Sequence, residues 1–235
     1  MRIISTANYD EMSKKGAAII AAQVLLNPKS VLGLATGSTP IGIYDYLAKA
    51  CMAGDLDFSE IISINLDEYC NLDISDENSY RYFMNHNLFS KININMDNTY
   101  VPDGLSDPDN ACKNYDKLIS DHGGIDLQLL GIGHNGHIAF NEPGSFFSKG
   151  THCIDLSEET VNANKRFFES ADLVPKRAIT MGIRDIMQAK KVVLVVSGDE
   201  KKDIFDKSFF GPVTPEVPAS ILQLHSDFTV ITAFS

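Results

Sequence analysis

Short apolar runs alternate with amphipathic stretches from one end of the chain to the other. The apolar runs have the length of strands and read SVLGLAT, EIISINLDEY, IDLQLLGIG and KVVLVVSG. The stretches that follow them resemble helices, as in PIGIYDYLAKAC, NSYRYFMNHNLF and DEKKDIFDKSFF. Runs that are apolar throughout are typical of strands buried on both faces. The alternation predicts an α/β fold with a doubly wound, mostly parallel sheet and helices on both faces, a Rossmann-like three-layer sandwich.

Both ends of the chain carry clear signals. A helix is expected from Asn8 to Leu26, because an Asn cap precedes an apolar pattern and Pro28 lies just beyond its end. A last strand is expected from Phe228 to Ala233. No Gly/Ser linker, low-complexity tract or internal repeat interrupts the sequence, which predicts one domain over residues 1–235.

Composition and charge limit the partners. The 235 residues suffice for a substantial core, and 44% hydrophobic with 22% charged residues is typical of globular proteins. A net charge of −11 would repel nucleic acid and anionic membranes, so neither is expected as a partner. If the substrate is an anion, a few well-placed donors must hold it.

The remaining composition predicts a cytoplasmic protein. The start, MRIISTANYDEMSKK, lacks the apolar segment of a signal peptide, and no run of about 18 apolar residues appears. Four scattered cysteines form no CxxC pair and are expected to be reduced, mostly buried thiols.

The motif ATGSTP follows the first apolar run at residues 35–40. In parallel sheets ligands bind beyond the carboxyl ends of strands, so polar motifs there are candidates for a site. Gly37 allows close approach, Ser38 and Thr39 supply hydroxyls, and a helix opening at Pro40 offers free amides to an anion. This motif predicts a phosphate cradle without the P-loop spacing, although an ordinary capped helix start fits equally well.

The motif NLDEY places two adjacent acids after a strand. A carboxylate in this position is a candidate general base. Asp67 and Glu68 point opposite ways if the strand continues, so only one can face a cleft. Periodicity does not say which, and a solvated acidic loop is the simpler alternative.

The stretch GIGHNGHIAFNEPG has the densest group of polar side chains with catalytic potential. Gly131, Gly133 and Gly136 match the dinucleotide-binding spacing GxGxxG, and Asp155 lies near the distance of its ribose-binding acid. Because Pro143 follows too soon for a crossover helix, nicotinamide binding is disfavoured.

His134, His137 and Glu142 could instead bind a metal, but HExxH spacing and a cysteine set are missing. His137 could also simply stabilise a turn. Its polar neighbours on glycine-permitted backbone favour proton-transfer chemistry.

Two pairs of basic residues could complete an anion site. Lys165 and Arg166 lie in ETVNANKRFFES, and Lys201 and Lys202 follow KVVLVVSG. Most lysines on helices are exposed to solvent. The sequence pattern does not indicate which of the two pairs binds the anion.

Taken together and in this order, LGLATGSTP, SINLDEY, GIGHNGHIAFNEPG, NANKRFF and ILQLH resemble the glucosamine-6-phosphate deaminases, from about Ser30 to Val230. The resemblance implies Asp67 as general base, His137 as ring-opening histidine and Glu142 as its paired acid. It also implies roles for a set of binding residues: phosphate donors Gly37, Ser38, Thr39, Arg166 and Lys201, and sugar contacts Thr36, Gly131 and Gly133.

The implied reaction converts glucosamine 6-phosphate and water to fructose 6-phosphate and ammonia, in amino-sugar catabolism. His137 shuttles a proton to open the ring, and Asp67 moves a proton from C2 to C1. No metal or organic cofactor is expected, since each step is proton transfer.

Three departures from the family pattern matter. Asn135 stands where some members carry an aspartate, so it is expected to position groups by hydrogen bonding rather than to relay protons. Residues 152–155, HCID, lack the basic side chains that bind N-acetylglucosamine 6-phosphate in regulated members, so an allosteric activator site is not expected. The chain ends at Ser235 without the extension of hexameric members, which predicts a monomer. Residues 152–181 resemble the family's lid.

Two other functions remain open. A 6-phosphogluconolactonase shares the implied fold and phosphate loop but needs no base at C2. A non-catalytic sugar-phosphate sensor would keep the phosphate loop and could lose Asp67, His137 or Glu142, all of which are present.

Overall fold

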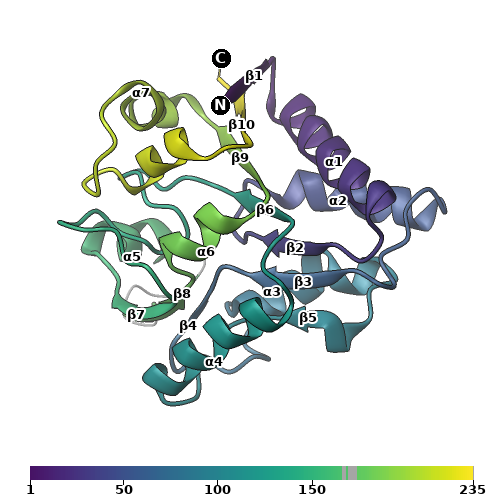
Figure 1. Cartoon of the computed structure of the whole chain (residues 1–235), viewed down its shortest axis with the longest axis horizontal. Helices are drawn as coiled ribbons and strands as arrows, with labels where there is room; N and C mark the ends of the chain where they lie inside the picture. The colour runs from purple at the N-terminus through teal and green to yellow at the C-terminus, as the bar shows by residue number, and fades with distance from the viewer. Residues whose placement is uncertain (166–167, 169–173, 235) are drawn as a thin grey trace.

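The computed structural model describes residues 1–165, 168 and 174–234. Its main feature is a seven-stranded sheet in which every adjacent pair is parallel, as Figure 1 shows. In spatial order the strands are β1 (Arg2–Thr6), β10 (Phe228–Ala233), β9 (Lys191–Ser197), β6 (Leu127–Leu130), β2 (Val31–Leu34), β3 (Ile62–Asn65) and β5 (Thr99–Tyr100). The predicted α/β fold with a mostly parallel sheet is confirmed.

Helices lie on both sides of this sheet, with α1 and α2 on one side and α6 and α7 on the other (Figure 1). The α-helices are α1 (Tyr9–Leu26), α2 (Ile41–Met52), α3 (Tyr80–Asn87), α4 (Pro108–Asp121), α5 (Glu158–Asn164), α6 (Ile183–Gln188) and α7 (Lys202–Phe210). Short 3-10 helices are η1 (Phe89–Lys91), η2 (Met96–Asn98), η5 (Asp199–Lys201) and η6 (Pro218–Leu224).

Local signals set the two predicted end elements. Asn8 caps α1 by accepting a hydrogen bond from the Glu11 amide, and the helix ends at Leu26, as expected. The last strand also has its predicted bounds. One detail differs: Pro40 occupies the cap position of α2 rather than its first turn.

The central strands form the core. Every residue of β2 and β6 is buried, and Val192–Val196 of β9 are at most 1% exposed. Each fully buried Val or Leu side chain contributes about 1.5–3 kcal/mol relative to exposure, so this layer is a rigid base for the loops at its ends.

A second, antiparallel sheet was not expected from the sequence. It consists of β4 (Asp67–Tyr69), β8 (Arg177–Thr180) and β7 (His152–Asp155), in that order. The run IISINLDEY does not form one strand, because the chain leaves the main sheet at Leu66, whose carbonyl accepts a hydrogen bond from the Met181 amide. The step places Asp67 at the boundary of the two sheets.

The small sheet also contains both ends of the predicted lid, residues 152–181. Residues 166–167 and 169–173 of that span lie outside the described residues. Movement of the span, like a single-domain organisation, stays a prediction.

The four cysteines are free thiols; Cys70 and Cys112 are buried, whereas Cys51 and Cys153 are half-buried. Among the described helices, none is long and apolar enough to cross a membrane.

Candidate active site

The order of strands reverses between β2 and β6. From β2 the chain adds β3 and β5 on one side, and from β6 it adds β9 and β10 on the other. Loops leave such a point in opposite directions and open a crevice beyond the strand ends. The loops here carry ATGSTP and GIGHNGH, two of the motifs selected by sequence.

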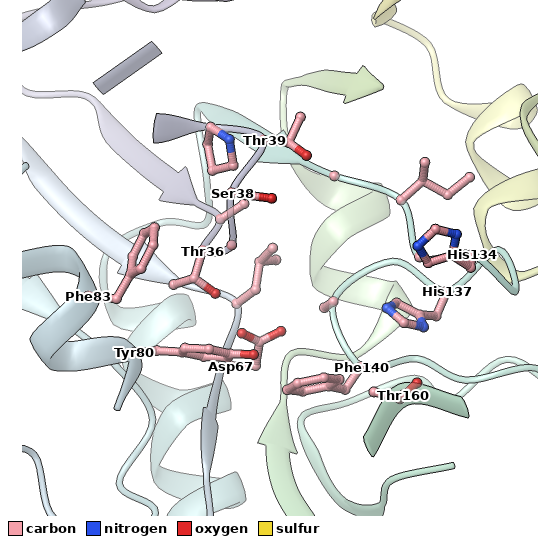
Figure 2. Close-up of a pocket in the computed structure, with 18 of the residues that line it drawn as sticks. Thr36, Ser38, Thr39, Asp67, Tyr80, Phe83, His134, His137, Phe140 and Thr160 are labelled. Atoms are coloured by element: carbon pink, nitrogen blue, oxygen red, sulfur yellow. The ribbon is translucent and has the colours of Figure 1, made fainter. Parts of the chain in front are cut away.

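A cavity of about 670 Å³ occupies this crevice. Figure 2 shows Thr36, Ser38 and Thr39 across the cavity from His134 and His137, with Asp67 below the threonines and beside Tyr80. The cavity brings together most of the predicted residues: Thr36, Gly37, Ser38, Thr39, Asp67, Gly131, Gly133, Asn135, His137 and Lys201. Glu142 lies behind the His137 wall, and Arg166 lies outside the described residues.

The ATGSTP loop is shaped to receive an anion. Gly37 has a φ of +91°, a left-handed conformation that side-chain-bearing residues rarely adopt. It turns the chain so that Ser38 and Thr39 stand just before α2, whose cap residue Pro40 makes no side-chain hydrogen bond to the first amides, although the Gly42 amide donates to the Tyr9 hydroxyl. The loop therefore combines hydroxyl donors with the positive end of a helix dipole.

Lys201 adds a positive charge to the same cavity. Its Nζ donates to the Ile132 carbonyl over 2.9 Å, which holds the ammonium beside the loop after β6. Lys202 faces away and lies 3.9 Å from Asp206, and Lys165 is exposed. Of the basic residues with described positions, Lys201 is thus the one placed to meet an anion.

The structure shows that Asp67 is the acid of the DEY motif that faces the cavity. Its side chain is 6% exposed and lines the cavity. Burial, with a smaller contribution from the charge of Glu68, raises the pKa of Asp67 to about 8 from an ordinary 3.8. A buried carboxyl poised near neutral pH is suited to take up and return a proton.

Glu68 has a structural task instead. Its carboxylate accepts hydrogen bonds from the amides of Tyr69, Tyr80 and Arg81, and so caps the start of α3. The alternation along β4 directs one acid to the helix and the other to the cavity.

The raised pKa of Asp67 predicts a pH-dependent stability. The folded chain binds the Asp67 proton more tightly than the unfolded chain does, so the stabilisation is complete below about pH 4 and is lost as pH rises through about 8. Asp67→Asn is uncharged in both states. We expect the variant to gain stability over wild type by up to roughly 1.4 kcal/mol per pH unit between these limits. Urea unfolding of both proteins at pH 4, 6 and 8 measures this difference; a constant difference would contradict the raised pKa.

The turn after β6 builds the opposite wall. A Cβ on Gly133 would clash with the His137 ring, so glycine leaves the space that the imidazole occupies. The side-chain oxygen of Asn135 accepts a hydrogen bond from the backbone amide of His137 over 3.1 Å. The side-chain nitrogen of Asn135 donates to Glu142 Oε2 over 2.7 Å. Asn135 therefore links the backbone of His137 to the Glu142 carboxylate, and its predicted positioning role in the reaction stays a prediction.

His137 and Glu142 face each other across a short gap. His137 Nδ1 lies 3.7 Å from Glu142 Oε2, and their side chains are 19% and 8% exposed. Burial alone would raise the pKa of Glu142, but the His137 imidazole, the Thr160 hydroxyl and the Asn135 amide together lower it to about 2. Glu142 is thus a carboxylate at neutral pH, and it faces the imidazole with a negative charge.

The cavity also has an aromatic wall that no sequence motif predicted. Tyr80 and Phe83 of α3 and Phe140 line the cavity, and the Tyr80 and Phe140 rings stack with centroids 6.0 Å apart. Tyr80 and Phe83 have the spacing of ordinary helix core positions, and Phe140 lies inside GIGHNGHIAFNEPG, where only the polar residues and glycines carried a functional signal. Thr160, which also lines the cavity, lies in ETVNANKRFFES, where only Lys165 and Arg166 were candidates.

The alternative interpretations of this loop gain no support. Residues 131–157, all of them described, contain no helix, and Asp155 is exposed beside Arg177 at 3.5 Å. The geometry lacks the helix of a dinucleotide fingerprint. Within the described part of the chain no three His, Cys, Asp or Glu side chains are grouped to hold a metal.

The site lies at the switch point of a parallel sheet. It combines a buried carboxyl of raised pKa, a histidine facing a glutamate, and a loop suited to bind an anion. This combination is typical of α/β enzymes that move protons on small phosphorylated substrates. The chain belongs to the family described as glucosamine-6-phosphate isomerases/6-phosphogluconolactonase, whose model matches residues 6–231.

Individual relatives refine this assignment. A protein of Lachnoclostridium phytofermentans named glucosamine-6-phosphate deaminase is 60% identical over 235 residues, 100% of each chain. A solved monomeric glucosamine-6-phosphate deaminase is 42% identical with a TM-score of 0.97, covering 99% of this chain and 97% of that one. The 6-phosphogluconolactonase of Thermotoga maritima is 19% identical with a TM-score of 0.75, covering 98% and 97%, and shares the fold.

Proposed function

We propose that this chain is a glucosamine-6-phosphate deaminase, which converts D-glucosamine 6-phosphate and water to D-fructose 6-phosphate and ammonia in amino-sugar breakdown. One observation supports the proposal most strongly: two groups suited to proton transfer face one cavity. Buried Asp67 lies on one wall, and His137 with Glu142 lies on another. Relatives at 50–60% identity carry the same name over nearly their whole length.

The first step is opening of the sugar ring. His137 takes the proton of the anomeric hydroxyl and gives one to the ring oxygen, the bond between C1 and that oxygen breaks, and an aldehyde forms at C1. Glu142 stabilises the imidazolium that exists between the two transfers.

Isomerisation and deamination follow. Asp67 removes the proton from C2 and returns it to C1, while a proton passes from the nitrogen to the C1 oxygen, which leaves a hydroxyl at C1 and an imine at C2. Water adds to that carbon and ammonia departs, giving the ketose. An Asp67 pKa of about 8 suits both halves of this transfer, because the same group must accept and then release a proton near neutral pH.

Phosphate binding orients the sugar between these groups. In this proposal Gly37, Ser38 and Thr39 donate to the phosphate, and Lys201 supplies charge, with Arg166 as a further cation. Thr36, Gly131 and Gly133 line the part of the cavity assigned to the sugar. Local donors thereby offset the unfavourable net charge of −11.

The proposal includes a monomeric, cytoplasmic enzyme without an allosteric activator site or added cofactor. A monomeric state is supported by the solved relative described as monomeric. His152 lies in β7 with Nδ1 3.0 Å from the Gly150 carbonyl oxygen, and Asp155 faces Arg177. Neither side chain brings a permanent positive charge for a second sugar phosphate.

The direct test is to supply the purified, metal-stripped protein with glucosamine 6-phosphate and, separately, with 6-phosphogluconolactone. We expect equal amounts of ammonia and fructose 6-phosphate from the first and no accelerated hydrolysis of the second. Lactone hydrolysis without ammonia would assign the chain to the other branch of its family. Tight sugar-phosphate binding without either reaction would indicate a sensor.

A further inference from the structure

Thr160 contacts the catalytic pair from a different part of the chain. It belongs to α5, is 3% exposed, and lines the cavity near Phe140 (Figure 2). Its hydroxyl donates to Glu142 Oε1 over 2.5 Å, a short hydrogen bond to a charged acceptor. The two residues are 18 apart in sequence, so tertiary structure makes this contact.

The direction of this hydrogen bond is set by Ser157, the cap of α5. The Ser157 hydroxyl accepts from the Thr160 amide over 3.2 Å and donates to the Thr160 hydroxyl over 3.0 Å. A hydroxyl has one proton to donate. Since the Thr160 oxygen accepts the hydrogen bond from Ser157, the proton of the Thr160 hydroxyl is directed to Glu142.

The two oxygens of Glu142 thus have separate partners. Oε1 accepts from Thr160, and Oε2 accepts from Asn135 and faces His137 Nδ1. Asn135 and His137 are both on the turn after β6, so they hold only one edge of the carboxylate. The Thr160 hydroxyl restrains the other edge and limits rotation of the carboxylate away from the imidazole.

We propose that Thr160 is a positioning residue for ring opening, which holds the Glu142 carboxylate against His137 through its hydroxyl. The inference rests on the proposed deaminase function and deepens it. Thr160 acts through Glu142 and has no proton-transfer step of its own. The contact also links α5, the helix before Arg166, to the histidine.

The test compares Thr160→Val, which keeps the shape but lacks the hydroxyl, with Thr160→Ser, which keeps the hydroxyl. We expect Thr160→Val to lower kcat about tenfold or more, with KM changed less than about twofold, because a hydrogen bond to a charged group is lost. Thr160→Ser should retain most of the activity. Unchanged kcat in the valine variant, or equal losses in both, would overturn the proposal.

A matched control and a binding assay separate positioning from folding. Thr151→Val makes the same change at a buried hydroxyl for which the described structure gives no hydrogen-bond partner, and should leave kcat unaltered. Substrate reduced at C1 is an open-chain polyol phosphate that needs no ring opening. Thr160→Val should bind it as wild type does, whereas a parallel loss of its binding would show a substrate-contact role and overturn the proposal. If Thr160→Val does not fold, Thr160→Ala takes its place.

A spectroscopic measurement tests the contact independently of activity. The carboxyl pKa of Glu142, followed by carbon NMR and assigned with Glu142→Gln, should rise in Thr160→Val and return towards the wild-type value in Thr160→Ser. An unchanged pKa would overturn the Thr160–Glu142 contact. Absence of deamination by the wild-type protein would instead remove the proposed function, and the NMR result would still report on the contact.

Discussion

Asp67→Asn is expected to lower kcat for deamination by about three orders of magnitude while leaving sugar-phosphate binding intact. The amide has nearly the shape of the carboxyl but cannot take the C2 proton. Loss of a positioned general base costs roughly 10²- to 10⁴-fold. Because the phosphate donors lie on other elements, the dissociation constant of the C1-reduced substrate should stay within about threefold of wild type. Ammonia release and calorimetric binding measure the two quantities.

The control for this prediction is Asp73→Asn, the same change on an exposed loop. It should retain full activity. The Asp67 variant should also fail to exchange the C2 proton of the substrate with deuterium from solvent. Undiminished ammonia release by Asp67→Asn would show that another group is the base and would remove the central step of the mechanism.

The same substitution links function to stability. Burial of Asp67 beside Glu68 raises its pKa and thereby destabilises the folded chain at neutral pH. An asparagine at this position is expected to be more stable and inactive. Such opposition between activity and stability is common where an active site holds a group in an unfavourable environment.

The sequence predicted the parts of the site that depend on strand-end motifs. ATGSTP and GIGHNGH each follow a buried strand directly, so their place at the sheet edge follows from the fold class. The run IISINLDEY was less informative. Whether Asp67 or Glu68 faces the cavity depends on the step at Leu66 into a second sheet, and that step depends on a hydrogen bond from Met181, far along the chain.

Other parts of the site had no local signal. Tyr80 has the spacing of a helix core residue, and Thr160 is one hydroxyl in a polar stretch. Their roles arise only when α3 and α5 pack beside the β6 loop, since stacking and hydrogen bonding to Glu142 are tertiary contacts. Conversely, GxGxxG matched the dinucleotide-binding spacing, but its glycine at 133 makes space for the His137 ring. The glycine spacing correctly indicated a backbone that needs glycine, but it did not specify the ligand.

His137→Gln is expected to make ring opening the limiting step. Glutamine can hydrogen-bond but cannot carry a proton between two oxygens at neutral pH. The enzyme would then depend on the small open-chain fraction that forms spontaneously in solution, and kcat/KM should fall by roughly 10²- to 10⁴-fold. Asp67 is untouched, so open-chain molecules that do bind should still be isomerised.

This predicts a particular kinetic signature. At high concentrations of the variant, the rate of ammonia release should stop rising with enzyme and equal the spontaneous rate of ring opening, which is measured separately from mutarotation. Wild type should show no such plateau, and neither should His86→Gln, in which an exposed histidine of α3 is changed. A variant rate that stays strictly proportional to enzyme concentration well above the spontaneous opening rate would mean that another group opens the ring, and that the His137–Glu142 pair serves only to shape the wall of the cavity.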